Sequence, residues 1–327
     1  MRTPAVAVMS ALTLAVSAAC APAVAPPAPS SAAPREVLLQ SADDIARTAA
    51  SLRRLDDLPL YEMTYHGGYD AEAPLTEAEL ARRGQGWACS LFHRAGEFGR
   101  NFDWDPNPAM VVRARAPDGY ASLSLADVSY LFPPGARPDL AAAQDRRRLA
   151  HAVLTPFDGM NEKGLAVGLA QVPDARLPAP RPGRVTVSGV RIIRLMLDRA
   201  ATVPEAIELM RRYDVDFTGS PQLHYLIADR AGRSAVVEYG DGRMNVIDDR
   251  YLTNIAMSGA DRAARLADRR YRLLAEGGDT DAMELLRRVA QHHTRWSVVY
   301  DLEDMTAKLV TAQRWDRVHD VRLAAGA

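Results

Sequence analysis

The sequence predicts an α+β fold, in which antiparallel sheets are combined with segregated helices, for two reasons. Short strands follow one another through tight turns, which is typical of antiparallel pairing. The helices come in pairs between groups of strands instead of alternating with single strands, as they would in a doubly wound fold. The 327 residues, of which 48% are hydrophobic, are enough for one large domain or two small ones.

The first half of the chain is expected to contain two helices and several strand pairs. Residues 41–55 place apolar side chains at helical spacing, and a second helix over 75–83 begins at the capping residue Thr76. A single strand is expected over 60–65. Three strand pairs follow, over 89–94 with 98–104, over 109–116 with 120–130, and on the two sides of a turn at 161–164.

The second half repeats this alternation of helix pairs and strand groups. A helix over 202–213 begins at a capping box formed by Thr202 and Glu205, and another helix is expected just before it, over 188–200. The remaining expected elements are strands over 224–229, 234–239, 243–247 and 251–257, helices over 259–276 and 281–292, and a hairpin over 296–301 and 308–313.

Residues 1–20 are expected to be a signal peptide. Arg2 precedes an apolar run over 5–19 that is too short to span a bilayer, and small residues follow it. The same end resembles a bacterial lipoprotein signal with Cys20 as the lipidated residue. We therefore expect an exported protein, periplasmic or on the cell surface, with membrane contact only through a lipid anchor at Cys20. Residues 21–35, rich in Ala, Pro and Ser, are expected to be a disordered tether.

Cys89 is the second of the two cysteines, and it stands alone once Cys20 is removed or lipidated. A single cysteine in an exported protein indicates a reactive thiol or an intermolecular disulfide. A buried and inert cysteine is the alternative. The glycines of residues 84–86, just before it, suit a processing site as well as they suit a loop.

The expected hairpin over 89–104 brings Arg100, Asn101 and Asp103 back towards Cys89. A thiol, a guanidinium and a carboxylate then lie at one end of a two-stranded ribbon. An Arg100–Asp103 pair that only ties the strands together is the structural alternative.

Several kinds of site are not expected. His292 and His293 form no metal-ligand pattern, and neither H-E-x-x-H nor CxxC is present. We expect no cofactor, because the dinucleotide and phosphate-loop spacings are missing. The net charge of −1 predicts no general affinity for nucleic acid. A histidine-assisted cysteine protease using His151 or His224 is left open.

An N-terminal cysteine needs no histidine. If the Ala88–Cys89 bond is cleaved, Cys89 gains an α-amine with a pKa of about 8 that can accept the thiol proton. In this context the chain resembles the choloylglycine hydrolase family of N-terminal-nucleophile hydrolases, which includes bile salt hydrolases and penicillin V acylases and has acid ceramidase-type amidases as relatives. The matching stretches run in order from Cys89 to the C-terminus: Cys89-Ser-Leu with residues 99–103, residues 158–165, residues 224–229 with 236–238, Thr253-Asn254, and residues 296–300.

The resemblance implies a four-layer αββα sandwich and hydrolysis of a linear amide C–N bond through an acyl-enzyme. It makes Cys89 the nucleophile and, through its amine, the base. The other site residues that it implies are Arg100 and Asp103 to hold the amine and thiol, Asn254 and Gln171 for the oxyanion, and a further arginine, assigned to Arg265 with Arg262 and Arg269 as competitors.

The expected domain plan is a signal peptide over 1–20, a tether over 21–35, a propeptide or small subunit over 36–88 and the amidohydrolase domain over 89–327. The expected partner is a small amide, and bile salts, penicillin V, N-acyl homoserine lactones and N-acyl amino acids all remain open. So does a homo-oligomer. The alternative function is that of an exported binding protein or lipoprotein of the same fold that is never cleaved.

Overall fold

The computed structural model describes residues 36–57, 59–73, 88–104, 108–132 and 136–323, within one compact unit. The expected signal peptide, the tether, the helix over 75–83 and the glycines before Cys89 lie outside the described residues.

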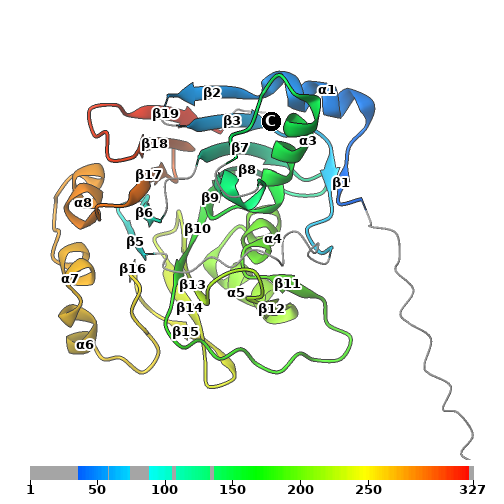
Figure 1. Cartoon of the computed structure of the whole chain (residues 1–327). Coiled ribbons are helices and arrows are strands. Elements are labelled where there is room, and N and C mark those ends of the chain that lie inside the picture. The colour runs from blue at the N-terminus through cyan, green and yellow to red at the C-terminus, as the bar shows by residue number, and fades with distance from the viewer. Residues whose placement is uncertain (1–35, 58, 74–87, 105–107, 133–135, 324–327) are drawn as a thin grey trace, which may run out of the picture. The chain divides into compact units, whose positions relative to one another are not determined.

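Two large sheets form the centre of this unit (Figure 1). The nine-stranded sheet has the order β15-β14-β13-β10-β9-β8-β7-β3-β2, and the six-stranded sheet has the order β16-β5-β6-β17-β18-β19. The strands of the nine-stranded sheet are β2 (Arg53–Asp56), β3 (Leu60–Thr64), β7 (Ala109–Arg115), β8 (Ala121–Asp127), β9 (Asp158–Asn161), β10 (Leu165–Gln171), β13 (Leu223–Asp229), β14 (Ser234–Gly240) and β15 (Arg243–Ile247). Those of the six-stranded sheet are β5 (Ala88–Arg94), β6 (Glu97–Asp103), β16 (Tyr251–Leu252), β17 (Thr294–Asp301), β18 (Thr306–Thr311) and β19 (His319–Arg322).

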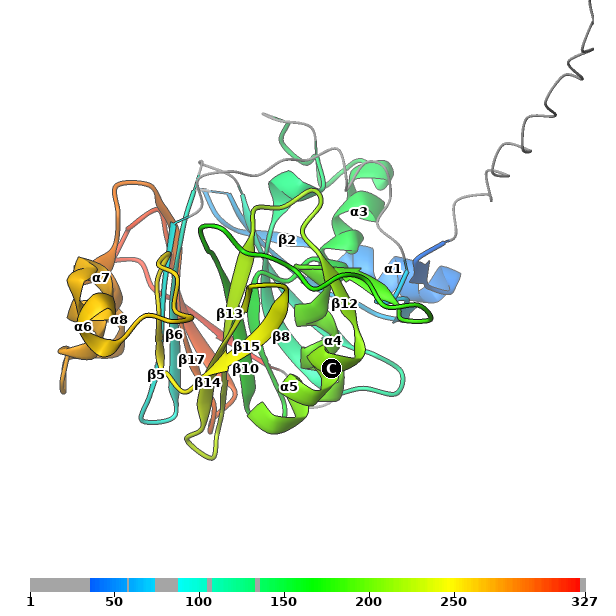
Figure 2. The same cartoon turned by 90° about the horizontal axis from the view of Figure 1, so that it is seen from below.

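Helices cover the outer faces of both sheets. On the nine-stranded sheet, α4 (Arg191–Arg199) packs on β8–β10 and α5 (Val203–Arg212) packs on β13 and β14. On the six-stranded sheet, α7 (Arg269–Ala275) packs on β5 and β16, and α8 (Ala282–Val289) packs on β6 and β17. Figure 2 shows α6 (Arg262–Ala267) with α7 and α8 on one side, the sheets in the middle, and α4 and α5 on the other side. The predicted αββα arrangement is confirmed.

The two sheets approach each other closely where β10 faces β5. A Cβ atom on Gly168 of β10 would lie only 2.6 Å from the side chain of Leu91 on β5, so glycine is required there for the close contact. This contact brings the end of β10 near the start of β5, which carries Cys89.

Residues 36–73 are part of the same architecture. The helix α1 (Ala42–Ser51) packs on β3, and β3 pairs in parallel with β7 from Leu60↔Ala109 to Thr64↔Arg113. This parallel pair is an exception to the expected antiparallel pairing. The remaining elements are the short strand pairs β1 (Leu38–Leu39) with β4 (Gly68–Tyr69) and β11 (Thr186–Ser188) with β12 (Asp214–Asp216), the helix α3 (Ala143–Ala150), and 3₁₀ turns at Val128–Tyr130 and His151–Leu154.

Four predictions of elements need correction. The helix expected over 41–55 ends at Ser51, because residues after Leu52 pair with β3 as strand β2. The strand expected over 251–257 ends at Leu252. The helix expected over 259–276 is broken at Asp268, whose side chain caps α7 by accepting the Tyr271 N–H. The helix expected over 281–292 ends at Val289, and β19 was not predicted.

Candidate active site

The hairpin of β5 and β6 forms as predicted. Its two-residue turn consists of Ala95 and Gly96 at φ values of +47° and +77°, the left-handed conformations that such hairpin turns need. Cys89 lies opposite Phe102, and Leu91 lies opposite Arg100. Because side chains alternate along a strand, the Cys89 thiol and Arg100 share one face of the ribbon, and Asp103 lies on the other face.

The thiol face is buried and carries an ordered charge pair. Cys89 and Arg100 are 0% exposed, and Nη2 of Arg100 lies 3.6 Å from the Cys89 Sγ. The other end of the guanidinium pairs with Asp158, which also accepts hydrogen bonds from Trp296 Nε1 at 3.1 Å and from the Tyr300 hydroxyl. Arg100 therefore pairs with Asp158, and the alternative of an Arg100–Asp103 strand tie is wrong.

Burial raises the pKa of the Cys89 thiol, and the positive charge of Arg100 opposes this rise. A thiol with a raised pKa is protonated at neutral pH, so its activation requires a base. Asp158, Trp296 and Tyr300 had no role assigned from the sequence, although they lie in the stretches that carry the family resemblance.

The backbone of Cys89 is held by side chains that come from far along the chain. Its N–H donates to Asn254 Oδ1 across 2.7 Å. Nη2 of Arg270 donates to the same Oδ1 across 3.0 Å, and Nη1 of Arg270 donates to the Cys89 carbonyl across 2.8 Å. The Asn254 Nδ2 donates to the Gln171 carbonyl across 2.8 Å. Two donors at Oδ1 and an acceptor at Nδ2 fix the orientation of the amide.

Asp103 is 0% exposed on the helix-facing side of the ribbon. Its carboxylate accepts hydrogen bonds from the Thr294 hydroxyl at 2.5 Å and from Gln291 Nε2 at 3.1 Å, and Arg270 Nη1 lies 3.7 Å away. Burial raises the pKa of Asp103, and these partners counteract it. Asp103 is thus fixed beside the backbone of Ala88, its partner across the hairpin.

The structure does not place Arg265 in this cluster. Its guanidinium pairs with Asp249 at 2.8 Å and donates to the Met257 carbonyl at 3.2 Å. The competitors Arg262 and Arg269 are exposed. The arginine that reaches Cys89 is Arg270, in the first turn of α7. Its signal in the sequence is Asp268, two positions earlier, a capping residue that marks the start of a new helix. Gln171 reaches Asn254 through its main-chain carbonyl.

The segment that follows Asn254 is held by a buried carboxylate. Glu238 accepts the N–H groups of Met257 at 2.8 Å and of Ser258 at 2.9 Å. The Oε2 atom of Glu238 also lies 3.0 Å from Nδ1 of His224. Burial acts to raise the pKa of Glu238, but these hydrogen bonds outweigh it and lower the pKa. His224 is therefore bonded to Glu238, an arrangement that does not support the alternative of a Cys89–His224 pair.

Within the described parts of the chain, no group of three or more His, Cys, Asp or Glu side chains gathers where it could hold a metal ion. No helix among the same residues is long and apolar enough to cross a membrane.

The αββα layers, with a cysteine at the start of an inner strand, define the N-terminal-nucleophile hydrolase fold. A mutant of the conjugated bile acid hydrolase from Clostridium perfringens has a similar structure, with a TM-score of 0.53 and 16% identity over 72% of this chain and 92% of that chain. At this identity the likeness shows the fold.

Residues 150–257 match the model of a family described as linear amide C-N hydrolases, choloylglycine hydrolase family. The resemblance that the sequence predicts is therefore confirmed, and the description names the expected class of hydrolase. A penicillin V acylase of Pectobacterium atrosepticum is 29% identical over 114 residues, which are 32% of this chain and 30% of that protein. An uncharacterised protein of Paramecium bursaria Chlorella virus 1 is 27% identical over 101 residues, 28% of this chain and 36% of that protein. The matches thus span about a third of each curated relative.

Proposed function

We propose that the protein is an exported hydrolase of linear amide C–N bonds that forms an acyl-enzyme on Cys89 after the Ala88–Cys89 bond is cleaved. The observation that carries this proposal is the hold on the Cys89 nitrogen. Asn254 accepts its N–H, and Arg270 binds both that Asn254 oxygen and the Cys89 carbonyl. These contacts fix the position of the Cys89 nitrogen. Once cleavage frees it, this nitrogen is the amine that acts as the base for the buried thiol of the same residue.

Cleavage is needed because an amide nitrogen cannot accept a proton at working pH. Once free, the amine takes the proton of the thiol, and the thiolate attacks the carbonyl carbon of the substrate. Asn254 and Gln171 are the proposed donors to the oxyanion, and Arg100 stabilises the thiolate. The ammonium then gives its proton to the leaving amine. Water, deprotonated by the same amine, hydrolyses the thioester and releases the acid.

The substrates proposed are N-acyl amides of the kind named by the relatives, penicillin V and conjugated bile acids. N-acyl homoserine lactones and N-acyl amino acids complete the panel. Amine release from each compound is the measurement, and it is made on the purified protein together with N-terminal sequencing and intact mass. We expect a chain that begins at Cys89 and turnover of at least one linear amide.

The matched control is Cys89→Ala, which should remain uncleaved and inactive. Turnover by a protein with an intact Ala88–Cys89 bond contradicts the proposal. A protein that stays intact and turns over none of the amides favours the alternative, an exported binding protein or lipoprotein of the same fold.

The proposal of export is supported by the apolar run and small residues of 1–20. Cell fractionation, with Cys20→Ser as the comparison, tests it. Release of the variant from a membrane-bound wild type indicates a lipid anchor, equal release of both proteins indicates an ordinary signal peptide, and cytoplasmic wild type contradicts export.

A further inference from the structure

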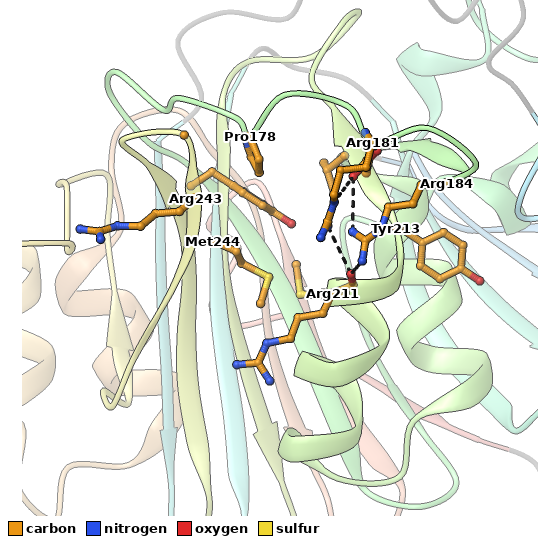
Figure 3. A pocket seen from close by; sticks show the side chains of 12 residues that line it. Pro178, Arg181, Arg184, Arg211, Tyr213, Arg243 and Met244 are labelled. Carbon is orange, nitrogen blue, oxygen red and sulfur yellow. Dashed lines mark hydrogen bonds and ion pairs between the residues drawn. The ribbon is translucent and has the colours of Figure 1, made fainter.

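A cavity of about 510 Å³ lies between α5, β12 and the hairpin of β14 and β15, beneath the segment that follows β10 (Figure 3). Its volume falls within the range of about 300–1,000 Å³ that small-molecule sites occupy. None of the described residues that line it belongs to the cluster around Cys89. Its lining is therefore distinct from the residues proposed for catalysis.

Positive charge exceeds negative charge in the lining of this cavity. Four arginines line it with one carboxylate, Asp214; they are Arg181, Arg184, Arg211 and Arg243. Arg181 Nε and Arg184 Nη1 share a single oxygen of Asp214, at 3.5 and 3.4 Å. The other Asp214 oxygen accepts the backbone N–H of Arg181 at 2.6 Å.

The two distances from the guanidinium nitrogens to Asp214 are longer than the 2.7–2.9 Å, roughly, of a close charge-assisted hydrogen bond. One carboxylate thus incompletely neutralises two guanidiniums. Figure 3 shows the side chains of Arg181 and Arg184 side by side near the main chain of Arg211, while the guanidinium of Arg243 turns away from them. Arg181 and Arg184 therefore form the part of the lining best placed to take a second anion.

Apart from Tyr213 and Tyr239, the side chains in the rest of the lining are apolar. Met210, Val215 and Met244 contribute hydrocarbon and sulfur, and the Tyr239 ring, 4% exposed, packs edge-on against Phe217. Within the described residues the Tyr239 hydroxyl makes no hydrogen bond. Burial raises the pKa of Tyr239, so this hydroxyl stays protonated and is a donor.

We propose that this cavity binds a small molecule that carries a carboxylate on an apolar body. The carboxylate lies between Arg181 and Arg184, and the apolar body lies against Met210, Met244 and the Tyr239 ring. Inorganic anions match only the arginines, and neutral hydrocarbons match only the apolar part, so the combination selects a monoanionic amphiphile.

Isothermal titration of the full-length protein with octanoate tests this proposal, with 1-octanol and octylammonium as neutral and cationic matches. We expect saturable octanoate binding, at least about tenfold weaker binding of 1-octanol, and none of octylammonium. The double variant Arg181→Gln/Arg184→Gln should weaken octanoate binding roughly tenfold to a hundredfold, because charge-assisted hydrogen bonds are lost. Arg287→Gln, at an exposed arginine on α8, is the control and should bind as wild type does.

A second variant keeps the test informative if the arginine variant folds poorly. Met244 is only half-buried on β15, so Met244→Asp should fold, and its negative charge should abolish octanoate binding. The proposal is overturned by non-saturable octanoate binding, by equal affinities for octanoate and 1-octanol, or by unchanged binding in the folded variants. Because the titration measures binding and not turnover, its outcome is independent of the proposed amide hydrolysis.

Discussion

The backbone N–H of Cys89 donates to the Oδ1 of Asn254 across 2.7 Å, although 165 positions separate the two residues. The contact exists while the nitrogen is still part of the Ala88–Cys89 peptide bond. The hold on this nitrogen therefore does not depend on cleavage, and breaking the bond converts an amide that is already positioned into an amine. The predictions on Arg270, Asn254 and Asp103 follow from this geometry.

Replacing Arg270 should slow the reaction more than it weakens substrate binding. Arg270→Gln removes the charged donor to Asn254 Oδ1 and to the Cys89 carbonyl. The side-chain amide of Asn254 and the backbone of Cys89 are then no longer held by the same guanidinium. We expect kcat to fall roughly tenfold to a hundredfold with a smaller change in KM, the usual effect of losing charge-assisted hydrogen bonds. Steady-state kinetics of the cleaved fraction measures this.

Arg265→Gln is the matched control for that variant. Arg265 lies close by in the sequence and is also half-buried, but it pairs with Asp249. Its loss should lower the melting temperature and leave kcat of the folded enzyme near wild type. If the two variants lose kcat equally, Arg270 has no special role.

Asn254→Ala should lower kcat by roughly 10²–10³-fold, which is typical for the loss of one oxyanion donor. The structure adds a second expectation. Because Asn254 also accepts the N–H of Cys89, the variant should accumulate more uncleaved chain than wild type. Intact mass gives the cleaved fraction, and active-site titration normalises the rate. Normal kcat in a fully cleaved variant removes Asn254 from the mechanism.

The sequence predicts local features of this fold well. The β5–β6 hairpin forms where expected, because a two-residue turn and two alternating strands are specified within 16 residues. The helix over 41–55 was predicted too long, because the apolar residues Leu52 and Leu55 fit a helix and a strand equally. Their state depends on pairing with β3, which local periodicity does not reveal.

The site residues also divide into those placed by local sequence and those placed by contacts between distant segments. Arg100 and Asp103 were predicted near Cys89 because the hairpin brings them there, but the sequence did not show that they lie on opposite faces. Arg270 was missed because its position depends on a helix break at Asp268. The role of Glu238 as the acceptor for residues 257–258 depends on contacts between distant segments, and no spacing in the sequence encodes them.

Asp103→Asn should reduce kcat of the cleaved enzyme by about ten to a hundredfold at a near-normal melting temperature. The carboxylate lies beside the Cys89 backbone and should stabilise the ammonium that forms when the amine takes the thiol proton. Thr294 and Gln291 donate to it and should still orient the amide that replaces it. A normal kcat, whatever the melting temperature, excludes Asp103 from the reaction.

Residues 36–73 should stay bound after cleavage before Cys89. They supply β2 and β3 to the nine-stranded sheet, and Asp56 binds His319 Nε2 at 2.7 Å and also pairs with Arg314 and Arg317. We expect two chains that separate on denaturing gels but elute together in native size-exclusion chromatography. Asp56→Asn should destabilise the complex by about 1.5–3 kcal/mol, because a buried carboxylate that accepts charged hydrogen bonds loses its charge.

Asp57→Asn is the control for that variant, since Asp57 is 74% exposed and should contribute at most about 1 kcal/mol through its surface ion pairs. Elution of the heavier chain alone from wild type indicates that the segment is a released propeptide.

Glu238→Gln should change how stability depends on pH. Its hydrogen bonds lower the pKa of Glu238 in the folded protein below the unfolded value. The stabilisation is therefore fully present above the unfolded pKa, which is about 4.3, and is lost as the pH falls through the folded pKa.

At pH 7 the Glu238→Gln variant should lose about 1.5–3 kcal/mol of unfolding free energy, because a charged acceptor of buried N–H groups is removed. As the pH falls through the folded pKa, wild type loses the same contribution and the two melting temperatures should converge. Glu303→Gln, at an exposed carboxylate, should follow wild type throughout. Melting temperatures measured from pH 7 downwards test this prediction. A difference between wild type and Glu238→Gln that stays constant with pH would show that the contacts to Met257 and Ser258 do not depend on the charge of Glu238.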